Sequence, residues 1–277
     1  MKKLLCMAMA CLMVAGCSSN SQGNGETNTE NKDTFTVGME CNYAPMNWTE
    51  QDATDLNYPA SAGGYCDGYD VQISKLIAED LGKELVIKKI AWDGLEMALN
   101  SGEIDAIIAG MSKTPERAEN ADFTTSYWES EMVMIVNSDG DLADASALED
   151  FSGRNVLGQL GTLYDSVIDQ IPEVNHLIPR DDYPTMIMAL KSGEADALTA
   201  ESQVGMGYVN SDDSLSLVYF DEGKGFEMSN DESAVAIAVK KGNADLLNNV
   251  QAALDKIDAQ TREELMNAAT SRQPSSN

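Results

Sequence analysis

Apolar residues between positions 69 and 81 return every three or four positions, which predicts a helix that ends at Gly82. Shorter apolar runs on either side have the length of buried strands, and the alternation continues along the chain. The expected strands are 34–39, 85–90, 104–109, 155–157, 174–178 and 195–200, and the other expected helices are 95–100, 164–171 and 185–191. Strands that alternate with helices predict parallel sheets covered by helices, so the fold class is α/β.

A ten-residue segment occurs twice. Residues 97–106 and 188–197 are identical at eight of ten positions, and each copy holds a helix end, a glycine and the start of a buried strand. The distance between the copies is too long for a solenoid repeat and predicts two similar α/β lobes. Ligands of α/β proteins bind beyond the carboxyl ends of the strands. The loop at 110–112 and the strand end at Glu201 should therefore face each other across a cleft.

The first residues have the pattern of an export signal. Two lysines precede an apolar run at 4–15, which is too short to span a bilayer as a helix. The run ends in Val-Ala-Gly-Cys, which resembles the bacterial lipobox and predicts removal of residues 1–16 and lipidation of Cys17. The alternative is a plain signal peptide with an incidental cysteine. Residues 17–33 are polar and lack periodicity, so we expect a flexible tether. The expected location is the extracytoplasmic face of the cell membrane, held by two acyl chains.

Composition and charge exclude several functions. The chain has 277 residues with 18 Lys and Arg against 46 Asp and Glu, for a net charge of −28. Such a surface repels phosphates, so no nucleic acid is expected as a partner. His176 is the single histidine, which leaves no histidine cluster for a metal and no Ser-His or Cys-His pair. We expect neither a metal nor a cofactor.

Two cysteines remain in the exported chain after the signal and the lipidated residue are set aside. Cys41 and Cys66 would meet an oxidising compartment, where disulfides persist. We expect a bridge between them, with two buried thiols as the alternative. No CxxC motif is present, which argues against redox catalysis.

A series of motifs resembles extracellular solute-binding proteins of family 3, the amino-acid-binding subunits of ABC importers. Their order and spacing carry the resemblance across nearly all of 34–258, although the C-terminal end lacks the aromatic residues common in the family. The motifs are Gly68-Tyr-Asp-Val-Gln, Trp92-Asp-Gly-Leu, Ser101-Gly-Glu-Ile-Asp-Ala, Thr114-Pro-Glu-Arg-Ala, Asp122-Phe-Thr, Gly161-Thr, Asp196-Ala and Ala236-Ile-Ala-Val-Lys.

The resemblance implies a two-lobed, type II periplasmic-binding-protein-like clamp with mostly parallel sheets. Lobe 1 would hold 34–130 plus 230–277, and lobe 2 would hold 131–229. Two hinge crossovers are expected, near 129–132 and 228–232. A free amino acid would bind between the lobes, and the closed form, expected to be a monomer, would dock on an ABC transporter permease.

A zwitterionic ligand needs a cation for its carboxylate and an anion for its ammonium. Arg117 follows the expected helix cap Thr114 by three residues, and its planar fork matches a carboxylate. The alternative is a surface arginine paired with Glu116 or Glu119. Glu201 takes the place of an acid, usually Asp, that the family has at the end of this strand. Its alternative is an ordinary acid near a helix start.

The resemblance assigns the remaining contacts. Ser112 and Thr162 would bind the ligand carboxylate, and Gly110 would contribute backbone groups. Tyr43 and Trp92 would flank the ligand side chain, with Trp48 as a third wall or as core. The other two expected contacts are polar: Glu40 and Gln159.

Two other functions compete with transport. A few proteins of this architecture dehydrate cyclohexadienyl acids, for which Glu201 or Glu40 could serve as acid or base. An extracellular amino-acid sensor is the other alternative. Lipidated export fits capture better than either, so we expect a binding protein rather than an enzyme. The side chain of the ligand is not defined by the sequence, although a polar or basic amino acid is favoured.

Overall fold

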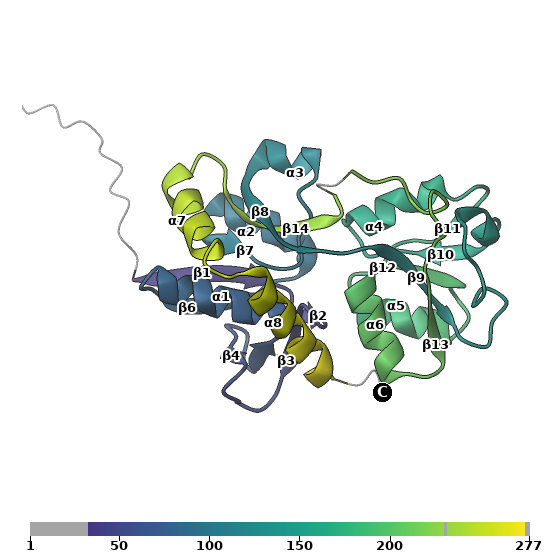
Figure 1. The fold of residues 1–277 in the computed structure, drawn as a ribbon, viewed down its shortest axis with the longest axis horizontal. Helices are drawn as coiled ribbons and strands as arrows, with labels where there is room; N and C mark the ends of the chain where they lie inside the picture. Colours follow the sequence, from purple (N-terminus) through teal and green to yellow (C-terminus); the bar gives the residue numbers. More distant parts are fainter. Residues whose placement is uncertain (1–32, 230–231, 275–277) are drawn as a thin grey trace, which may run out of the picture. The chain divides into compact units, whose positions relative to one another are not determined.

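The structure is a computed structural model that describes residues 33–229 and 232–274 (Figure 1). The predicted signal peptide, the lipidation of Cys17 and the tether up to residue 32 lie outside the described residues. Within the described ranges, no helix combines the length and the apolar character that crossing a membrane requires.

The first of two five-stranded sheets is mixed in direction. Its order is β6 (Glu84–Lys89), β1 (Thr34–Met39), β7 (Ala106–Ile107), β14 (Ala234–Lys240) and β8 (Ala121–Glu129). β1 pairs in parallel with β6 and β7, whereas β14 pairs antiparallel with β7 and β8. Only β14 therefore runs against the other strands of this sheet.

The second sheet repeats this arrangement. Its order is β11 (Asn175–His176), β10 (Asn155–Leu157), β12 (Ala197–Glu201), β9 (Met132–Asn137) and β13 (Leu215–Val218). β10 pairs in parallel with β11 and β12, and β9 pairs antiparallel with β12 and β13. The strands β11, β10, β12, β9 and β13 correspond, in this order, to β6, β1, β7, β14 and β8 of the first sheet. The two copies of the repeated segment therefore lead into corresponding central strands, β7 and β12.

The helices divide between the two sheets in the same way (Figure 1). Those beside the first sheet are α1 (Tyr69–Asp80), η1 (Trp92–Gly94), α2 (Leu95–Ser101), α3 (Pro115–Asn120), α7 (Ala244–Leu254) and α8 (Ala259–Arg272). Those beside the second are η2 (Leu148–Phe151), α4 (Leu163–Ser166), η3 (Val167–Gln170), α5 (Tyr183–Lys191) and α6 (Ser202–Ser211). A small antiparallel sheet of β2 (Asn42–Tyr43), β3 (Asn47–Glu50), β5 (Tyr65–Asp67) and β4 (Tyr58–Pro59) adjoins the first group.

The chain passes between the two sheets twice. β8 ends at Glu129 and β9 begins at Met132, and Figure 1 shows one leading directly into the other. The return runs from β13 to β14. The predicted hinge segments lie in these two connections, although residues 230 and 231 are not among those described.

Several elements are shorter than the apolar pattern suggests. The expected helix 164–171 is instead the short α4 followed by the 3₁₀ turn η3. Pro172 explains this end, because the residue before a proline is disfavoured in helical conformation. The expected strand 174–178 is reduced to the two residues of β11, which forms the edge of its sheet.

The C-terminal helix α8 is held by charged groups rather than by an aromatic tail. Arg272 donates to both carboxylate oxygens of Asp67, at 3.1 and 2.9 Å, and its guanidinium lies 5.6 Å from the ring centre of Trp48. Arg262 donates to the backbone carbonyls of Leu254 and Ser126. The departure from the family's aromatic ending therefore leaves the last helix packed on the first group of elements.

Cys41 and Cys66 form a disulfide, with their Cα atoms 5.8 Å apart. The bridge joins the end of β1 to β5 of the small sheet. It therefore supports the segment that leads from Glu40 to Tyr43, where two predicted ligand contacts lie.

Candidate functional site

One cleft collects most of the residues that the sequence singles out. Its lining consists of Glu40, Tyr43, Trp92, Gly110, Ser112, Arg117, Gln159, Thr162, Leu163 and Tyr164. The segments that follow β1, β6, β7 and β10 supply these residues, so the site lies at the carboxyl ends of strands from both sheets, as expected for α/β folds. Of the predicted contacts, Glu201 lies behind this lining, and Trp48, the possible third wall, is not part of it.

The cleft is closed in the structure. It encloses about 10 Å³, which is no more than the space of a single water molecule. Trp92 donates its indole N–H to the carbonyl of Gly161 at 3.1 Å, which joins η1 to the loop after β10. Asn42 and Asp182 make a second contact between the two groups of elements, at 3.4 Å. An amino acid can enter only when these contacts separate.

Arg117 is a buried cation at the beginning of α3. Thr114 caps this helix by accepting the backbone N–H of Arg117 at 3.2 Å, which fixes where the side chain leaves the helix. The guanidinium stacks on Trp92, with 5.2 Å between Cζ and the ring centre. Only 9% of the residue is exposed, and burial lowers the pKa of the guanidinium against the opposing effect of Glu96.

The donors of Arg117 point to oxygen atoms from three segments. Nη1 donates to the carbonyl of Ser112 at 3.0 Å, and Nη2 donates to the carbonyl of Gly161 at 3.2 Å. Nε donates to Glu96 at 3.2 Å. The charge partner is therefore Glu96 of α2 and neither of the two glutamates beside Arg117 in sequence. A bidentate carboxylate would match this fork better than the two neutral carbonyls do.

Glu201 is a buried carboxylate with half of its hydrogen-bonding capacity unused. Its Oε1 accepts from the hydroxyls of Tyr43 at 2.8 Å and Tyr164 at 2.6 Å. Oε2 is buried and has no hydrogen-bond partner among the residues that the structure describes, and 1% of Glu201 is exposed. Burial raises the pKa of this carboxyl, against the lowering effect of the two tyrosine bonds. A buried charge of this kind is costly unless a cation pairs with it.

Tyr164 is a functional candidate that sequence reasoning missed. It lies in the first turn of α4, two residues after Thr162, and it lines the cleft while bonding Glu201. The sequence feature that could have identified Tyr164 is its position just after the Gly161-Thr162 turn, separated from it by Leu163. Thr162 itself caps α4, since its hydroxyl donates to the carbonyl of Gln159 and accepts from the N–H of Asp165.

Glu40 and Gln159 meet across the cleft. Gln159 donates to Oε2 of Glu40 at 3.0 Å and to the carbonyl of Asp181 at the same distance. Burial, with a smaller contribution from the charge of Asp182, raises the pKa of Glu40 to about 8. The pair forms a polar wall of the cleft, in which the carboxyl of Glu40 is the titratable group.

A buried network supports the loop at Gly110. The N–H of Gly110 donates to the hydroxyl of Tyr127 at 3.0 Å, and that hydroxyl donates to Asp70 at 2.7 Å. Asn47 donates to the second oxygen of Asp70 at 2.8 Å, and burial raises the pKa of Asp70 to about 7. The Gly-Tyr-Asp motif noted in the sequence therefore positions the loop rather than lining the cleft.

Trp48 does not line the cleft. Its ring lies under Arg272, and its indole N–H donates to Glu50 at 2.7 Å. Trp48 is therefore a core residue, which was the alternative to a third wall of the cleft.

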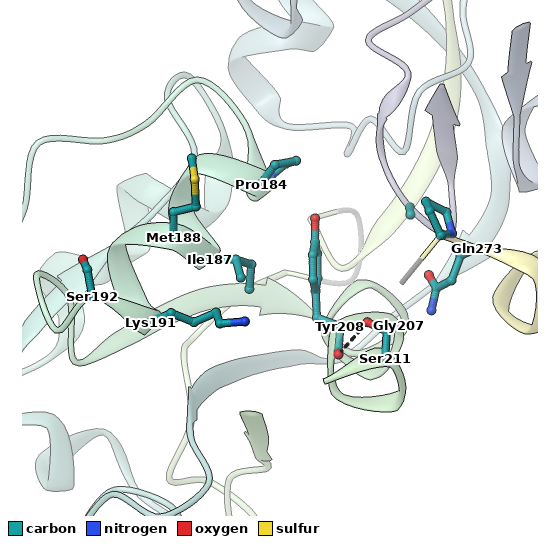
Figure 2. A pocket seen from close by; sticks show the side chains of 11 residues that line it. Pro184, Ile187, Met188, Lys191, Ser192, Gly207, Tyr208, Ser211 and Gln273 are labelled. Atoms are coloured by element: carbon teal, nitrogen blue, oxygen red, sulfur yellow. Dashed lines mark hydrogen bonds between the residues drawn. The ribbon is translucent and has the colours of Figure 1, made fainter. Parts of the chain in front are cut away.

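A larger cavity of about 610 Å³ lies elsewhere, between α5, α6 and the end of α8 (Figure 2). Figure 2 shows Ile187 and Tyr208 facing it, and its polar lining includes Lys191, Ser192, Ser211 and Gln273. Among the described residues that line it, none has a carboxylate side chain to pair with an ammonium group. Size alone therefore does not identify the binding site of this chain.

The comparison with known proteins agrees with the geometry of the cleft. Residues 35–268 match bacterial extracellular solute-binding proteins, family 3, and the chain belongs to this family. The ABC transporter glutamine-binding protein GlnH of Bacillus subtilis is 28% identical over 270 residues, which are 95% of this chain and 94% of GlnH. The L-cystine-binding protein TcyJ of Escherichia coli is 30% identical over 256 residues, which are 91% of this chain and 89% of TcyJ.

Solved structures show the same fold. The amino acid ABC transporter substrate-binding protein AbpA of Streptococcus pneumoniae, bound to L-arginine, superposes with a TM-score of 0.75 at 25% identity. The match covers 86% of this chain and 95% of AbpA. These relatives are described as binding proteins and not as enzymes.

Proposed function

We propose that this protein captures a free amino acid outside the cytoplasm by closure of two lobes and delivers it to the permease of an ABC importer. The observation that carries the proposal is one cleft with a buried cation on one side and a buried, half-satisfied carboxylate behind the other. Arg117 and Glu201 have the opposite charges that the two ends of a zwitterion require. The binding functions named for GlnH, TcyJ and AbpA support the same conclusion.

In this mechanism the ligand carboxylate replaces the carbonyl contacts of Arg117 and also meets Ser112, Thr162 and the backbone at Gly110. The ligand ammonium donates to Oε2 of Glu201, whose other oxygen keeps the two tyrosine hydroxyls. Closure removes both charge pairs from water, which strengthens each of them.

The side chain of the ligand is polar or basic in this proposal. It would lie between Tyr43 and Trp92 and reach Glu40 and Gln159, which are 6% and 3% exposed. A carboxyl that changes protonation near neutral pH can accept a bond from a cation or donate one to an amide. The glutamine, cystine and arginine named for relatives all have polar side chains.

The moving parts are two lobes that turn about the two connections between the sheets. We assign 34–130 with 230–277 to one lobe and 131–229 to the other.

The protein would be a monomer and would be held at the extracytoplasmic face of the membrane through a lipid on Cys17. Cys17→Ser should abolish incorporation of radiolabelled palmitate in growing cells, and incorporation into that variant would contradict the anchor.

A thermal-shift screen against the common amino acids tests the binding proposal. A ligand at one hundred times its Kd stabilises the native state by about 2.7 kcal/mol, which gives a clear rise in Tm. We expect one polar or basic amino acid to give the largest rise, and its amide to give much less. If no amino acid raises Tm or releases heat in isothermal titration, the proposed function is wrong.

A further inference from the structure

His176 of β11 lies between two carboxylates of the segment that carries part of the cleft lining. Its Nε2 is 2.9 Å from Oδ1 of Asp165 in α4, and its Nδ1 is 2.9 Å from Oδ1 of Asp169 in η3. A neutral imidazole has one N–H and can donate to only one of these carboxylates, whereas an imidazolium donates to both. Both contacts are therefore hydrogen bonds only when the ring is charged.

The two aspartates supply the charges that act on the ring. Burial lowers the pKa of His176, but the bonds to Asp165 and then to Asp169 outweigh it, so this pKa lies above its ordinary value of 6.5. The neighbouring strand β10, with the sequence Asn-Val-Leu, has no ionisable side chain. The other charged residues on the adjoining segments are exposed or form ion pairs of their own: Glu173, Arg154 with Asp141, and Arg180 with Glu194.

Asp165 connects the histidine to the cleft. Its backbone N–H donates to the hydroxyl of Thr162 at 3.3 Å, and that hydroxyl donates to the carbonyl of Gln159 at 2.8 Å. A Cβ on Gly158 would lie 2.5 Å from Cα of Asp165, so α4 rests directly on the backbone beside Gln159. Tyr164, the residue before Asp165, lines the cleft. A shift of Asp165 therefore also moves Thr162 and Tyr164.

The segment formed by α4 and η3 is too short to hold this arrangement by itself. Each of the two elements has four residues, and Pro172 follows soon after them. Short helical turns are marginal in water, so contacts with other elements decide where such a segment lies. His176 makes this kind of contact, because it reaches both elements from β11. With 24% of its side chain exposed, the ring can exchange its proton with solvent.

We propose that His176 is a positioning residue for ligand binding: the imidazolium holds α4 and η3 in place, and with them the cleft residues Thr162 and Tyr164. Loss of the ring proton removes one of the two bonds to the aspartates. Ligand affinity therefore falls as pH rises through the titration of His176. By linkage, a bound ligand raises the pKa of the ring to the same extent. The inference rests on the proposed function and adds control by pH to it.

NMR titration of the ring tests the proposal directly, because His176 is the single histidine of the chain. Protein purified without a histidine tag gives imidazole resonances from this residue alone. The probe is the amino acid that gives the largest rise in Tm, and the ring is titrated with and without a saturating amount of it. We expect an affinity about fivefold weaker for the neutral ring, which corresponds to a rise of the pKa by about 0.7 on binding.

His176→Gln removes the charge and keeps a hydrogen-bond donor. Isothermal titration with the same amino acid at pH 6 and pH 9 should show the variant binding about fivefold more weakly than the wild type at pH 6 and equally at pH 9. Glu40 and Asp70 titrate in both proteins, so the ratio of the two affinities isolates His176. Glu173→Gln is the matched control, since it removes an exposed carboxylate near β11, and it should follow the wild type.

Equal affinities of wild type and His176→Gln at pH 6 would overturn the inference, and so would a loss of the same size at both pH values. A ring pKa that does not change on binding would overturn it as well. If a low Tm shows that the variant folds poorly, the NMR titration of the wild-type protein decides. Wild-type protein that binds no amino acid at either pH would overturn the proposed function, and with it this inference.

Discussion

The hydroxyl of Tyr43 donates to Oε1 of Glu201 at 2.8 Å, although the two residues are 158 positions apart and belong to strands of different sheets, β2 and β12. Because β2 and β12 belong to different sheets, we expect this bond to break when the cleft opens. It leaves Oε2 of Glu201 without a partner among the described residues, and this is the atom that we propose for the ligand ammonium. In the proposed mechanism, Tyr43 therefore links the binding of the ligand ammonium to closure.

The two residues should differ in their effect on binding. Glu201→Gln removes the charge that faces the ligand ammonium, so we expect affinity to fall by about 30-fold or more, given about 2–5 kcal/mol for a buried charge pair. Tyr43→Phe removes one hydrogen bond to a carboxylate, for which about 1.5–3 kcal/mol is typical. Isothermal titration measures both. A larger loss for Tyr43→Phe than for Glu201→Gln would contradict this order.

Glu40 should make the ligand-free protein less stable as pH rises. Its pKa is about 8 in the native state against an ordinary value of 4.5, so between these values the folded protein holds a proton that the unfolded chain has lost. Unfolding then becomes easier from pH 5 to pH 8. Each pKa unit corresponds to about 1.4 kcal/mol, so the contribution amounts to a few kcal/mol.

Urea unfolding at pH 5 and pH 8 measures this effect. Glu40→Gln should lose less stability between the two pH values than the wild type does. The exposed Glu222→Gln is the control and should behave like the wild type. Asp70 and Glu201 also have raised pKa values, so a residual dependence on pH is expected in the Glu40 variant. The same dependence in wild type and Glu40→Gln would show that Glu40 does not hold this proton.

Alanine substitutions at Gly110 and Gly82 distinguish the cost of backbone strain from the cost of a steric clash. Both have a positive φ, of 62° and 64°, which an alanine adopts at a cost of about 1–2 kcal/mol. A Cβ on Gly110 would lie 2.8 Å from Cε1 of Tyr43, whereas a Cβ on Gly82 would meet nothing within 4 Å. Gly110→Ala must therefore displace Tyr43 as well.

We expect Gly82→Ala to lower the free energy of unfolding by about 1 kcal/mol and to leave ligand affinity unchanged. Gly110→Ala should destabilise the protein more and should weaken binding about tenfold or more, because Tyr43 bonds Glu201. Urea unfolding and isothermal titration give the two quantities. Equal affinities in the two variants would show that the Gly110 loop tolerates a side chain.

The sequence indicates many of the site residues because they lie just after strand ends or at the starts of helices, and short local patterns mark these positions. Thr114 and Pro115 define the start of α3 locally, so Arg117 could be placed in the first turn without knowledge of the rest of the fold. The repeat indicated two lobes because both copies keep the same glycine after the same helix. These features depend on neighbours within a few positions, which the sequence displays directly.

Partners across the fold could not be deduced in this way. Glu96 is 21 positions from Arg117, and Tyr127 is 57 from Asp70, so neither pairing has a local signal. β8 was missed because its burial is mixed and its apolar residues do not alternate. β9 was missed although its apolar residues are buried in one continuous run, which is a signal that the sequence does display. Packing between distant segments decides such contacts, and it depends on the whole chain.

Arg117 should dominate affinity. Closure would bury the ligand carboxylate against the guanidinium, and removal of one partner leaves the other charge unpaired, at a cost of about 2–5 kcal/mol. Arg117→Ala should therefore weaken binding by roughly 30-fold to several thousand-fold. Arg117→Lys should restore part of the loss, because an ammonium lacks the planar fork.

Amidation of the ligand carboxylate completes a double-mutant cycle with Arg117→Ala. The amide should lose much affinity for the wild type and little for the variant, because the variant no longer has the partner of that carboxylate. Isothermal titration of both proteins with the amino acid and its amide gives the four values. Glu116→Ala is the matched control, since its side chain is in the same turn of α3 but does not line the cleft. An amide penalty that is equal in wild type and Arg117→Ala would show that Arg117 does not hold the carboxylate.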